Sequence, residues 1–441
     1  MSRTISRCER STIIPLLCTM SKLTLIRNIS QLVQVETEPR SCVKGKDMNS
    51  LPIIGNAYLL IENELIAGFG KMSEFQNHFP HLNPDTIKTL DVEGRMVFPS
   101  FCDSHTHLVY AGSREKEFED RIAGLSYEEI AKRGGGILNS AKRLGTASET
   151  ELYESAMLRI HEIISYGTGA VEIKSGYGLS VEAELKMLRV IRKIKETAPL
   201  AVKATFLGAH AFPAEFKENH GEYIRLLTDK MIPMIAGEGL ADYIDVFCDR
   251  GFFSPEETNT ILEAGAKYGL TPKIHANELG FTGGVQSGVA NHALSVDHLE
   301  HIDEEEIALL KGSSTMPTLL PSTAFFLGLK YPPARKMIDA GLPVALASDY
   351  NPGSSPSGKM PFVLSLACIK MKMTPAEAIH AATVNGAYAM GLEKTMGSIT
   401  IGKVANIFIT RKIPGTAFIP YSFGSDLIEE VFLKGKKNSD D

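Results

Sequence analysis

From about residue 96 onward, short apolar, β-branched segments alternate with amphipathic helical segments. Such alternation is typical of βα units around a parallel sheet. The predicted strands, eight in all, cover residues 96–103, 170–174, 202–208, 243–247, 272–275, 294–297, 314–318 and 344–348. Eight alternations without a glycine-rich phosphate turn favour an α/β fold of the closed (β/α)8 TIM-barrel type over a doubly wound sheet.

Helix start signals lie between these strands. Ser254 is followed by Pro255 and, three residues on, by Glu257, which predicts a capping box with proline at the first helical position. Thr374 and Glu377 repeat this spacing. The sequence therefore predicts helices that begin near residues 255 and 375.

Both ends of the chain carry short strand patterns instead. Residues 23–27 and 58–62 near the start, and 397–402 and 406–409 near the end, alternate with turn residues. We expect them to build one small composite β-sandwich domain beside the barrel. The predicted divisions are 1–96 (N-terminal extension and first part of the β domain), 97–395 (barrel) and 396–441 (second part of the β domain and tail).

The first 22 residues have no assigned role. An apolar run near residue 13 is short and broken by Pro15, so an extension ahead of a start near Met20 is favoured over a transit peptide.

Composition excludes several classes of protein. Lys and Arg total 46 against 52 Asp and Glu, a formal charge of −6, so we expect no nucleic-acid partner. The sequence lacks the run of about 18 apolar residues that a membrane span requires. Six cysteines without CxxC spacing indicate reduced thiols and a cytoplasmic location. A small molecule is the expected partner, and a homodimer is left open.

In such barrels the active site forms at the C-terminal ends of the strands. His105 and His107 follow the first strand and, being two apart in extended chain, point to one side. His275 and Asp349 follow the fifth and eighth strands. Three imidazoles and one carboxylate suit Zn²⁺ or Fe²⁺. His298 lies at the end of the sixth strand. Three roles remain open for it: metal ligand, base and substrate contact.

Such a site implies hydrolytic chemistry. A bound ion lowers the pKa of its water to about 7, so hydroxide becomes available at neutral pH. We expect attack on a carbonyl or amidine carbon, with Asp349 at the barrel mouth accepting the proton of the water.

The run 98–107 resembles the first-strand signature of the amidohydrolase superfamily. The runs 172–179 (EIKSGYGL), 275–278 (HANE) and 348–354 (SDYNPGS) resemble more specifically the imidazolonepropionase family, over residues of about 55 to 405. The resemblance implies metal-dependent opening of the 4-imidazolone-5-propanoate ring to N-formimidoyl-L-glutamate, a step of histidine degradation. It also implies one divalent ion, Zn²⁺ or Fe²⁺ (Fe³⁺). Residues 248–250 read Cys-Asp-Arg where binuclear relatives carry a bridging lysine, which favours one ion over two.

The resemblance further implies roles for individual residues. Arg114, beside the solvated-looking run 115–117, would bind the propanoate carboxylate. Catalytic roles would belong to Asp349, Glu278 and His298. The other expected substrate contacts are Tyr177, His210, Glu278, Asn351, Gly353 and Ser354.

Two alternatives remain. A deaminase of a heterocyclic base would use the same barrel and expel ammonia, but an uncharged base does not require Arg114. A non-catalytic scaffold barrel would lack metal, whereas the ligand set here is complete.

Overall fold

The computed structural model describes residues 22–125, 129 and 135–438, so the predicted N-terminal extension up to residue 21 lies outside the described residues. Two sheets organise the chain. The larger sheet is a parallel barrel whose strands follow one another in sequence order. Its strands are β6 (Phe101–Thr106), β7 (Thr168–Lys174), β8 (Ala201–Ala209), β9 (Tyr243–Cys248), β11 (Ile274–Ala276), β12 (Ser295–His298), β13 (Met316–Leu319) and β14 (Ala345–Leu346), with β10 (Thr271–Pro272) paired to β9. The predicted (β/α)8 fold class is confirmed.

One strand prediction was wrong in its extent. The run predicted as a single strand over 96–103 is divided between the two sheets, with β5 (Val97–Pro99) in the smaller one and β6 in the barrel. Ser100 lies between them, and its N–H donates to the carbonyl of Asn406 at 2.9 Å. The residues on both sides of Ser100, 96–99 and 101–102, are buried and apolar, so the hydrophobic pattern runs on unbroken where the chain changes sheets.

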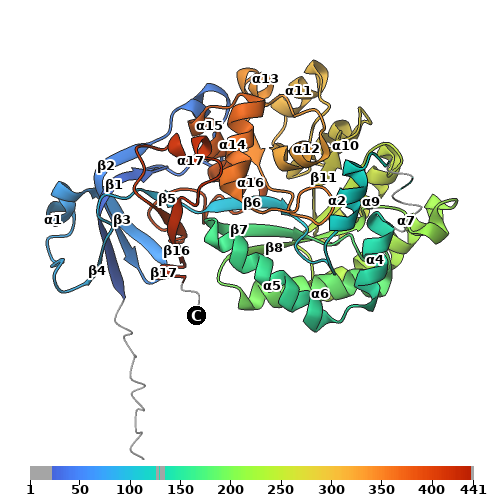
Figure 1. Cartoon of the computed structure of the whole chain (residues 1–441), viewed down its shortest axis with the longest axis horizontal. Helices are drawn as coiled ribbons and strands as arrows, with labels where there is room; N and C mark the ends of the chain where they lie inside the picture. Colours follow the sequence, from blue (N-terminus) through green and yellow to red (C-terminus); the bar gives the residue numbers. More distant parts are fainter. Residues whose placement is uncertain (1–21, 126–128, 130–134, 439–441) are drawn as a thin grey trace, which may run out of the picture.

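The smaller sheet joins the two ends of the chain, as predicted, but the strand predicted over 397–402 was wrong, since this segment forms only an isolated bridge between Ile399 and Val35. Its order is β17-β16-β15-β5-β1-β2-β3, with β4 also paired to β1. The strands are β1 (Leu23–Val33), β2 (Ile53–Glu62), β3 (Leu65–Lys71), β4 (Lys88–Asp91), β15 (Ile407–Thr410), β16 (Ile428–Leu433) and β17 (Lys436–Lys437). Figure 1 shows the blue N-terminal strands beside the red C-terminal ones at one end of the molecule. Ile29, Val97, Ile407 and other buried residues from both chain ends form its core.

Helices cover the barrel (Figure 1). They are α2 (Glu115–Ile122), α4 (Ile137–Thr146), α5 (Glu149–Ser165), α6 (Val181–Thr197), α7 (His220–Leu226), α8 (Ile232–Gly237), α9 (Pro255–Lys267), α10 (Gly284–Ala290), α11 (Glu304–Lys311), α12 (Pro321–Leu327), α13 (Ala334–Asp339), α14 (Met360–Met371), α15 (Pro375–Ala382) and α16 (Val384–Ala389). The short helix α1 (Phe75–His78) follows β3 of the smaller sheet, and α17 (Phe418–Tyr421), between β15 and β16, packs against α14. Both predicted capping boxes are present: Ser254 and Glu257 begin α9, and Thr374 and Glu377 begin α15. Across the described residues, no helix is both long and apolar enough to cross a membrane.

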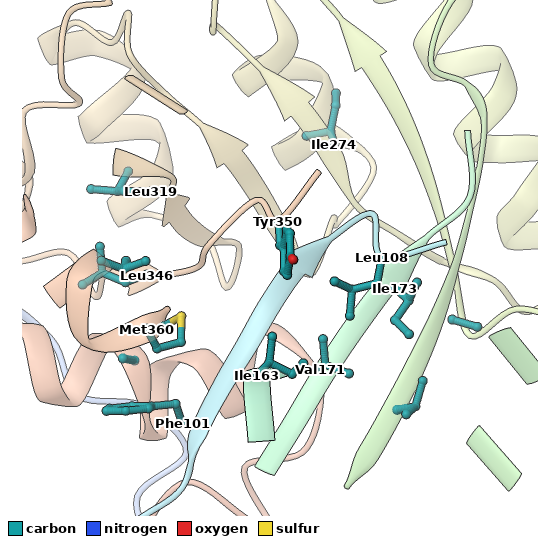
Figure 2. Packing of buried hydrophobic residues seen from close by; sticks show 14 of the residues in the cluster. Phe101, Leu108, Ile163, Val171, Ile173, Ile274, Leu319, Leu346, Tyr350 and Met360 are labelled. Atoms are coloured by element: carbon teal, nitrogen blue, oxygen red, sulfur yellow. The ribbon is translucent and has the colours of Figure 1, made fainter. Parts of the chain in front are cut away.

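Apolar side chains fill the space between the barrel strands and the helices. Val171 and Ile173 of β7 belong to the same buried cluster as Ile163 of α5, and Figure 2 shows them close together. These β-branched residues suit a buried parallel strand, where both faces are covered. The core therefore fixes the strand ends on which the polar residues of the mouth stand.

The barrel closes at its mouth through two backbone hydrogen bonds. The Asp349 N–H donates to the His105 carbonyl at 3.0 Å, and the His107 N–H donates to the Tyr350 carbonyl at 2.9 Å. Below them the Asp103 carboxylate accepts the N–H and the hydroxyl of Ser348 at 2.9 and 2.5 Å. The segment that follows β14 is thus held against β6.

Phe408 links the two sheets and should contribute strongly to stability. Its buried ring stacks on Phe98 and contacts Phe101 of β6, with ring centroids 5.0 and 4.9 Å apart. We expect Phe408→Ala to lower the free energy of unfolding by about 3–5 kcal/mol because it leaves a cavity between the sheets. Phe423→Ala, at a side chain 60% exposed, should change it by less than about 0.5 kcal/mol. Denaturant unfolding measures both, and equal losses would contradict this role of Phe408.

Candidate active site and metal centre

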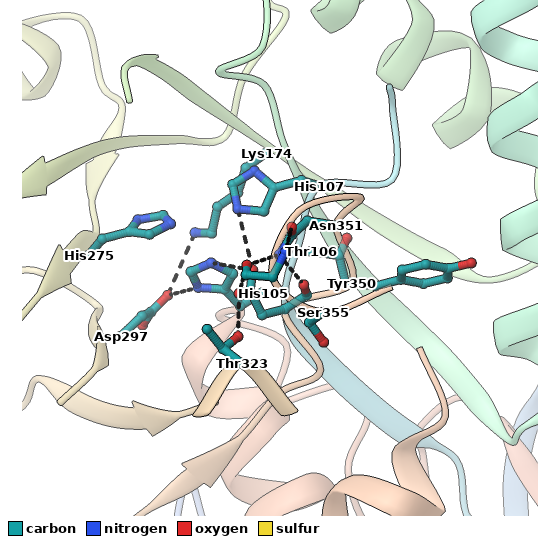
Figure 3. Close-up of polar contacts among 12 residues, drawn as sticks. His105, Thr106, His107, Lys174, His275, Asp297, Thr323, Tyr350, Asn351 and Ser355 are labelled. Carbon is teal, nitrogen blue, oxygen red and sulfur yellow. Dashed lines mark hydrogen bonds and ion pairs between the residues drawn. The ribbon is translucent and has the colours of Figure 1, made fainter. Parts of the chain in front are cut away.

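Three buried histidines meet at the mouth of the barrel. His105 is on β6, His107 directly follows it, and His275 is on β11. One ring nitrogen from each lies within 4.8 Å of the other two. Figure 3 shows the three rings turned toward one space. Strands distant in sequence therefore supply a compact nitrogen cluster.

Two aspartates orient these rings from below. His105 donates from Nδ1 to Asp297 at 2.6 Å, and His275 donates from Nδ1 to Asp245 at 3.1 Å. Since a carboxylate only accepts, each ring carries a hydrogen at Nδ1 and turns Nε2 to the space between them, where neither Nε2 has a hydrogen-bond partner among the described residues. Burial lowers the pKa of His105 and of His107 well below the usual value, so both rings are neutral. Neutral imidazoles held by a carboxylate are the form that binds a transition metal, so these residues fit a metal ion.

Asp349 completes the cluster. Its Oδ1 lies 3.6 Å from Nε2 of both His105 and His107, while its Oδ2 accepts the Thr323 hydroxyl at 2.5 Å. The backbone of Asp349 is left-handed, with φ of +52°. Three of the four predicted ligands therefore form one compact group, and Asp349 places a carboxylate beside two of them, His105 and His107.

A network of buried charges supports the cluster. Lys174 Nζ lies 2.6 Å from Glu172, 2.7 Å from Asp245 and 3.6 Å from Asp297, all with fully buried side chains. Lys273 bonds the other oxygen of Glu172. In Figure 3, Asp297 is linked both to His105 and to Lys174. The network ties together the two aspartates that orient His105 and His275.

Sequence reasoning missed Asp245 and Asp297. Asp245 lies inside the otherwise apolar strand β9, and Asp297 lies in β12, one residue before its end. A charged residue within a buried strand needs a partner of opposite charge or a metal, and that was the available signal.

His298 lies between two carboxylates. Its Nε2 is 3.7 Å from Glu278 and its Nδ1 is 3.6 Å from Glu300. Burial opposes a charge on the ring, but Glu278 and Glu300 outweigh it and raise the pKa of His298 to about 10. Burial also raises the pKa of Glu278 to about 7, although His298 opposes this. His298 is therefore placed beside Glu278, with its ring 5.3 Å from that of His275.

His210 and Tyr177 form one wall of the site. The His210 ring stacks on His107 with centroids 5.2 Å apart, and its Nδ1 donates to the Gly176 carbonyl at 3.1 Å. Burial and nearby His275 lower the pKa of His210 to about 3, so the ring is neutral and leaves Nε2 as an acceptor. The Tyr177 ring lies 5.7 Å from His107, and burial raises its pKa, so it carries a phenol proton.

Arg114 stands at the N-terminus of α2 and is not simply solvated. Glu117 accepts hydrogen bonds from Arg114 Nε at 2.9 Å and Nη2 at 2.5 Å. Glu117 is buried and also accepts the Gly136 N–H at 3.0 Å, so the prediction of a solvated run over 115–117 was wrong at that residue. Spacing of three residues on a helix turn explains the pairing. Arg114 Nη1 lies so close to Gly353 that an added Cβ there would come within 2.3 Å of it.

The loop after β14 uses its own side chains to hold its shape. Asn351 Oδ1 accepts the N–H groups of Gly353 and Ser354, both at 2.8 Å, and its Nδ2 donates to the Asp349 carbonyl at 2.7 Å. Asn351 therefore shapes the loop around Asp349, and its amide is engaged within that loop. Ser354 Oγ lies 3.4 Å from Asp349 Oδ2.

A (β/α)8 barrel with this histidine cluster at its mouth is the architecture of metal-dependent hydrolases. Residues 96–437 match the model of the amidohydrolase family. The solved structure of guanine deaminase from E. coli superposes with a TM-score of 0.71 at 16% identity, covering 95% of this chain and 99% of that one, a likeness of fold alone.

Curated relatives place the chain more narrowly. It is 58% identical to imidazolonepropionase of Flavobacterium johnsoniae over 414 residues, which is 94% of this chain and 99% of the relative. It is 59% identical to imidazolonepropionase of Flavobacterium psychrophilum over 413 residues, with the same coverage. The chain belongs to the imidazolonepropionase family within the amidohydrolases.

Removing one ligand should empty the metal centre. We expect His275→Ala to lose most bound metal, because one of three converging ring nitrogens is gone. His292→Ala, an exposed histidine outside the cluster, should keep the metal content of the unmodified protein. Elemental analysis of the purified proteins measures this, and full occupancy in His275→Ala would contradict the assignment.

Proposed function

We propose that the chain hydrolyses 4-imidazolone-5-propanoate to N-formimidoyl-L-glutamate, in the degradation of histidine to glutamate. The observation that carries this proposal is the pairing, at one barrel mouth, of a buried three-histidine cluster with Arg114 held against Gly353. The cluster serves hydrolysis, and a fixed arginine serves a substrate that carries a carboxylate. The family membership described above points to the same reaction.

Recognition of the substrate falls to residues around the cluster. Arg114 would bind the propanoate carboxylate, with Glu117 holding its guanidinium in place. The phenol of Tyr177 and the Nε2 of His210 offer a donor and an acceptor for the ring. The turn at Gly353 and Ser354, held by Asn351, lies beside Arg114 and would contact the same end of the substrate.

The reaction adds one water to the ring. The water oxygen bonds to the ring carbonyl carbon, and the bond from that carbon to the adjacent ring nitrogen breaks with its electron pair staying on nitrogen. A bound ion supplies hydroxide at neutral pH. Asp349 would accept the proton of the water, since its Oδ1 faces the cluster.

The leaving nitrogen must gain one proton, while the former carbonyl becomes a carboxylate. Glu278 would bond the ring N–H or carry this proton, and a pKa near 7 suits that task at neutral pH. His298 lies beside Glu278 and would keep it in place. Asn351 would act through the loop that it holds.

One ion per chain is proposed, with His105, His107, His275 and Asp349 as ligands. Nitrogen and oxygen donors suit both Zn²⁺ and Fe²⁺, and Fe³⁺ would follow oxidation of the latter. Lys174, whose ammonium lies among three carboxylates, fills the space beneath the cluster with a fixed positive charge, which supports one ion over two.

We also propose a cytoplasmic location and a small-molecule substrate without a nucleic-acid partner. The four cysteines within the described residues (Cys42, Cys102, Cys248 and Cys368) are free thiols, as expected in a reducing compartment. The formal charge of −6 disfavours binding to phosphate backbones.

A product assay tests the reaction directly. Metal-loaded protein incubated with 4-imidazolone-5-propanoate should consume the ring chromophore and yield formimidoyl-glutamate without ammonia. The chelated protein should do neither until metal is restored. Release of ammonia from a heterocyclic base, with the imidazolone left intact, would show a deaminase instead.

Arg114→Ala should damage recognition while sparing the metal. Loss of one partner of a buried ion pair costs ~2–5 kcal/mol, or roughly 30-fold to several thousand-fold in kcat/KM. Metal content should stay unchanged, as it should in Arg411→Ala, an exposed arginine directly after β15 of the smaller sheet that serves as the control. A ring without the side-chain carboxylate should be turned over about equally by all three proteins. Full efficiency of Arg114→Ala on the propanoate substrate would remove Arg114 from the site.

A further inference from the structure

Glu300 is a buried carboxylate that the reaction above does not use. Its side chain is 0% exposed, and its Oε2 lies 3.6 Å from His298 Nδ1. Within the described part of the chain, neither of its oxygens has a hydrogen-bond partner. Because burying a carboxylate is costly without a compensating group, the contact with His298 is what accounts for its place here.

The backbone reaches this arrangement through an unusual turn. His298 and Leu299 both have left-handed backbones, with φ of +84° and +65°. Two hydrogen bonds hold the turn: the Leu299 N–H donates to the Ala276 carbonyl at 3.1 Å, and the His301 N–H donates to the Asn277 carbonyl at 3.0 Å. Two successive residues of this kind are strained, and such strain persists where the surrounding structure enforces it, most often at functional sites.

We propose that Glu300 is a positioning residue that orients His298 for the hydrolysis. The two carboxylates contact opposite nitrogens of the ring, Glu300 at Nδ1 and Glu278 at Nε2. With the Glu300 carboxylate facing Nδ1 at 3.6 Å, the Nε2 edge of the ring is turned toward Glu278, which the proposed function places against the substrate. This inference rests on the proposed function, and Glu300 acts through His298 alone.

Two substitutions separate charge from contact. Glu300→Leu should lower kcat by about 10–100-fold with KM and metal content unchanged, because it removes both the negative charge and the polar group that face Nδ1. Glu300→Gln, which still offers an oxygen, should lose only about fivefold, and it carries the test if the leucine variant does not fold. Glu377→Gln is the control: its carboxylate is buried in the α15 capping box and pairs with Arg335, away from the mouth, so kcat should stay at the level of the unmodified protein. Unchanged kcat in the folded Glu300 variants would overturn the proposal.

A spectroscopic measurement needs no turnover. In zinc-loaded protein with ¹⁵N-labelled histidine, the His298 signals are assigned by their loss in His298→Asn. We expect a protonated Nδ1 in the unmodified protein, an altered Nδ1 signal in Glu300→Leu and a smaller change in Glu300→Gln. Unaltered His298 signals in both variants would overturn the role of Glu300. Failure to hydrolyse the imidazolone by the unmodified protein would instead overturn the proposed function, so the two failures are distinct.

Discussion

Closure of the barrel and assembly of the proposed metal ligands depend on the same two backbone hydrogen bonds. Those bonds join His105 to Asp349 and His107 to Tyr350, so three of the four proposed ligands belong to the residues that close the barrel. A parallel barrel closes only when its first and last strands pair, and here they pair beside the proposed metal ligands. A metal ion held there would bind the closed form and not the open one, and would therefore stabilise the whole barrel.

The buried lysines and carboxylates beneath the histidines orient the rings more than they stabilise the fold. Removing two ammonium groups and three carboxylates from water is expensive, and hydrophobic residues of similar size often stabilise a core as well. What hydrophobic residues cannot do is hold an imidazole by its Nδ1. Glu172, Asp245 and Asp297 share this buried layer with the two lysines, Lys174 and Lys273. Asp245 and Asp297 are the two carboxylates of the layer that hold His275 and His105.

Much of the architecture could be predicted from the sequence, because strand and helix patterns differ in period and the strand ends carry the polar residues. The change of sheets at Ser100 could not, since the residues on both sides are equally apolar. Glu117 looked solvated because the helix turn that places it under Arg114 is not visible in the residue types. The residues proposed as metal ligands could be selected from the strand ends alone, whereas the partners of Asp245 and Asp297 depend on which strands become neighbours. The sequence also does not show that the amide of Asn351 bonds within its own loop, because those contacts depend on how the loop is folded.

The smaller sheet has a consequence for how the chain is made. Strand β5 lies between β1, which is synthesised early, and β15, which ends at residue 410. On the ribosome, β5 therefore has an unpaired edge until nearly the whole chain has emerged. The Phe98 ring lacks its stacking partner Phe408 for the same time. Exposed strand edges and late long-range pairing are the conditions under which nascent chains aggregate. Chaperone protection of the nascent chain would matter most in that interval.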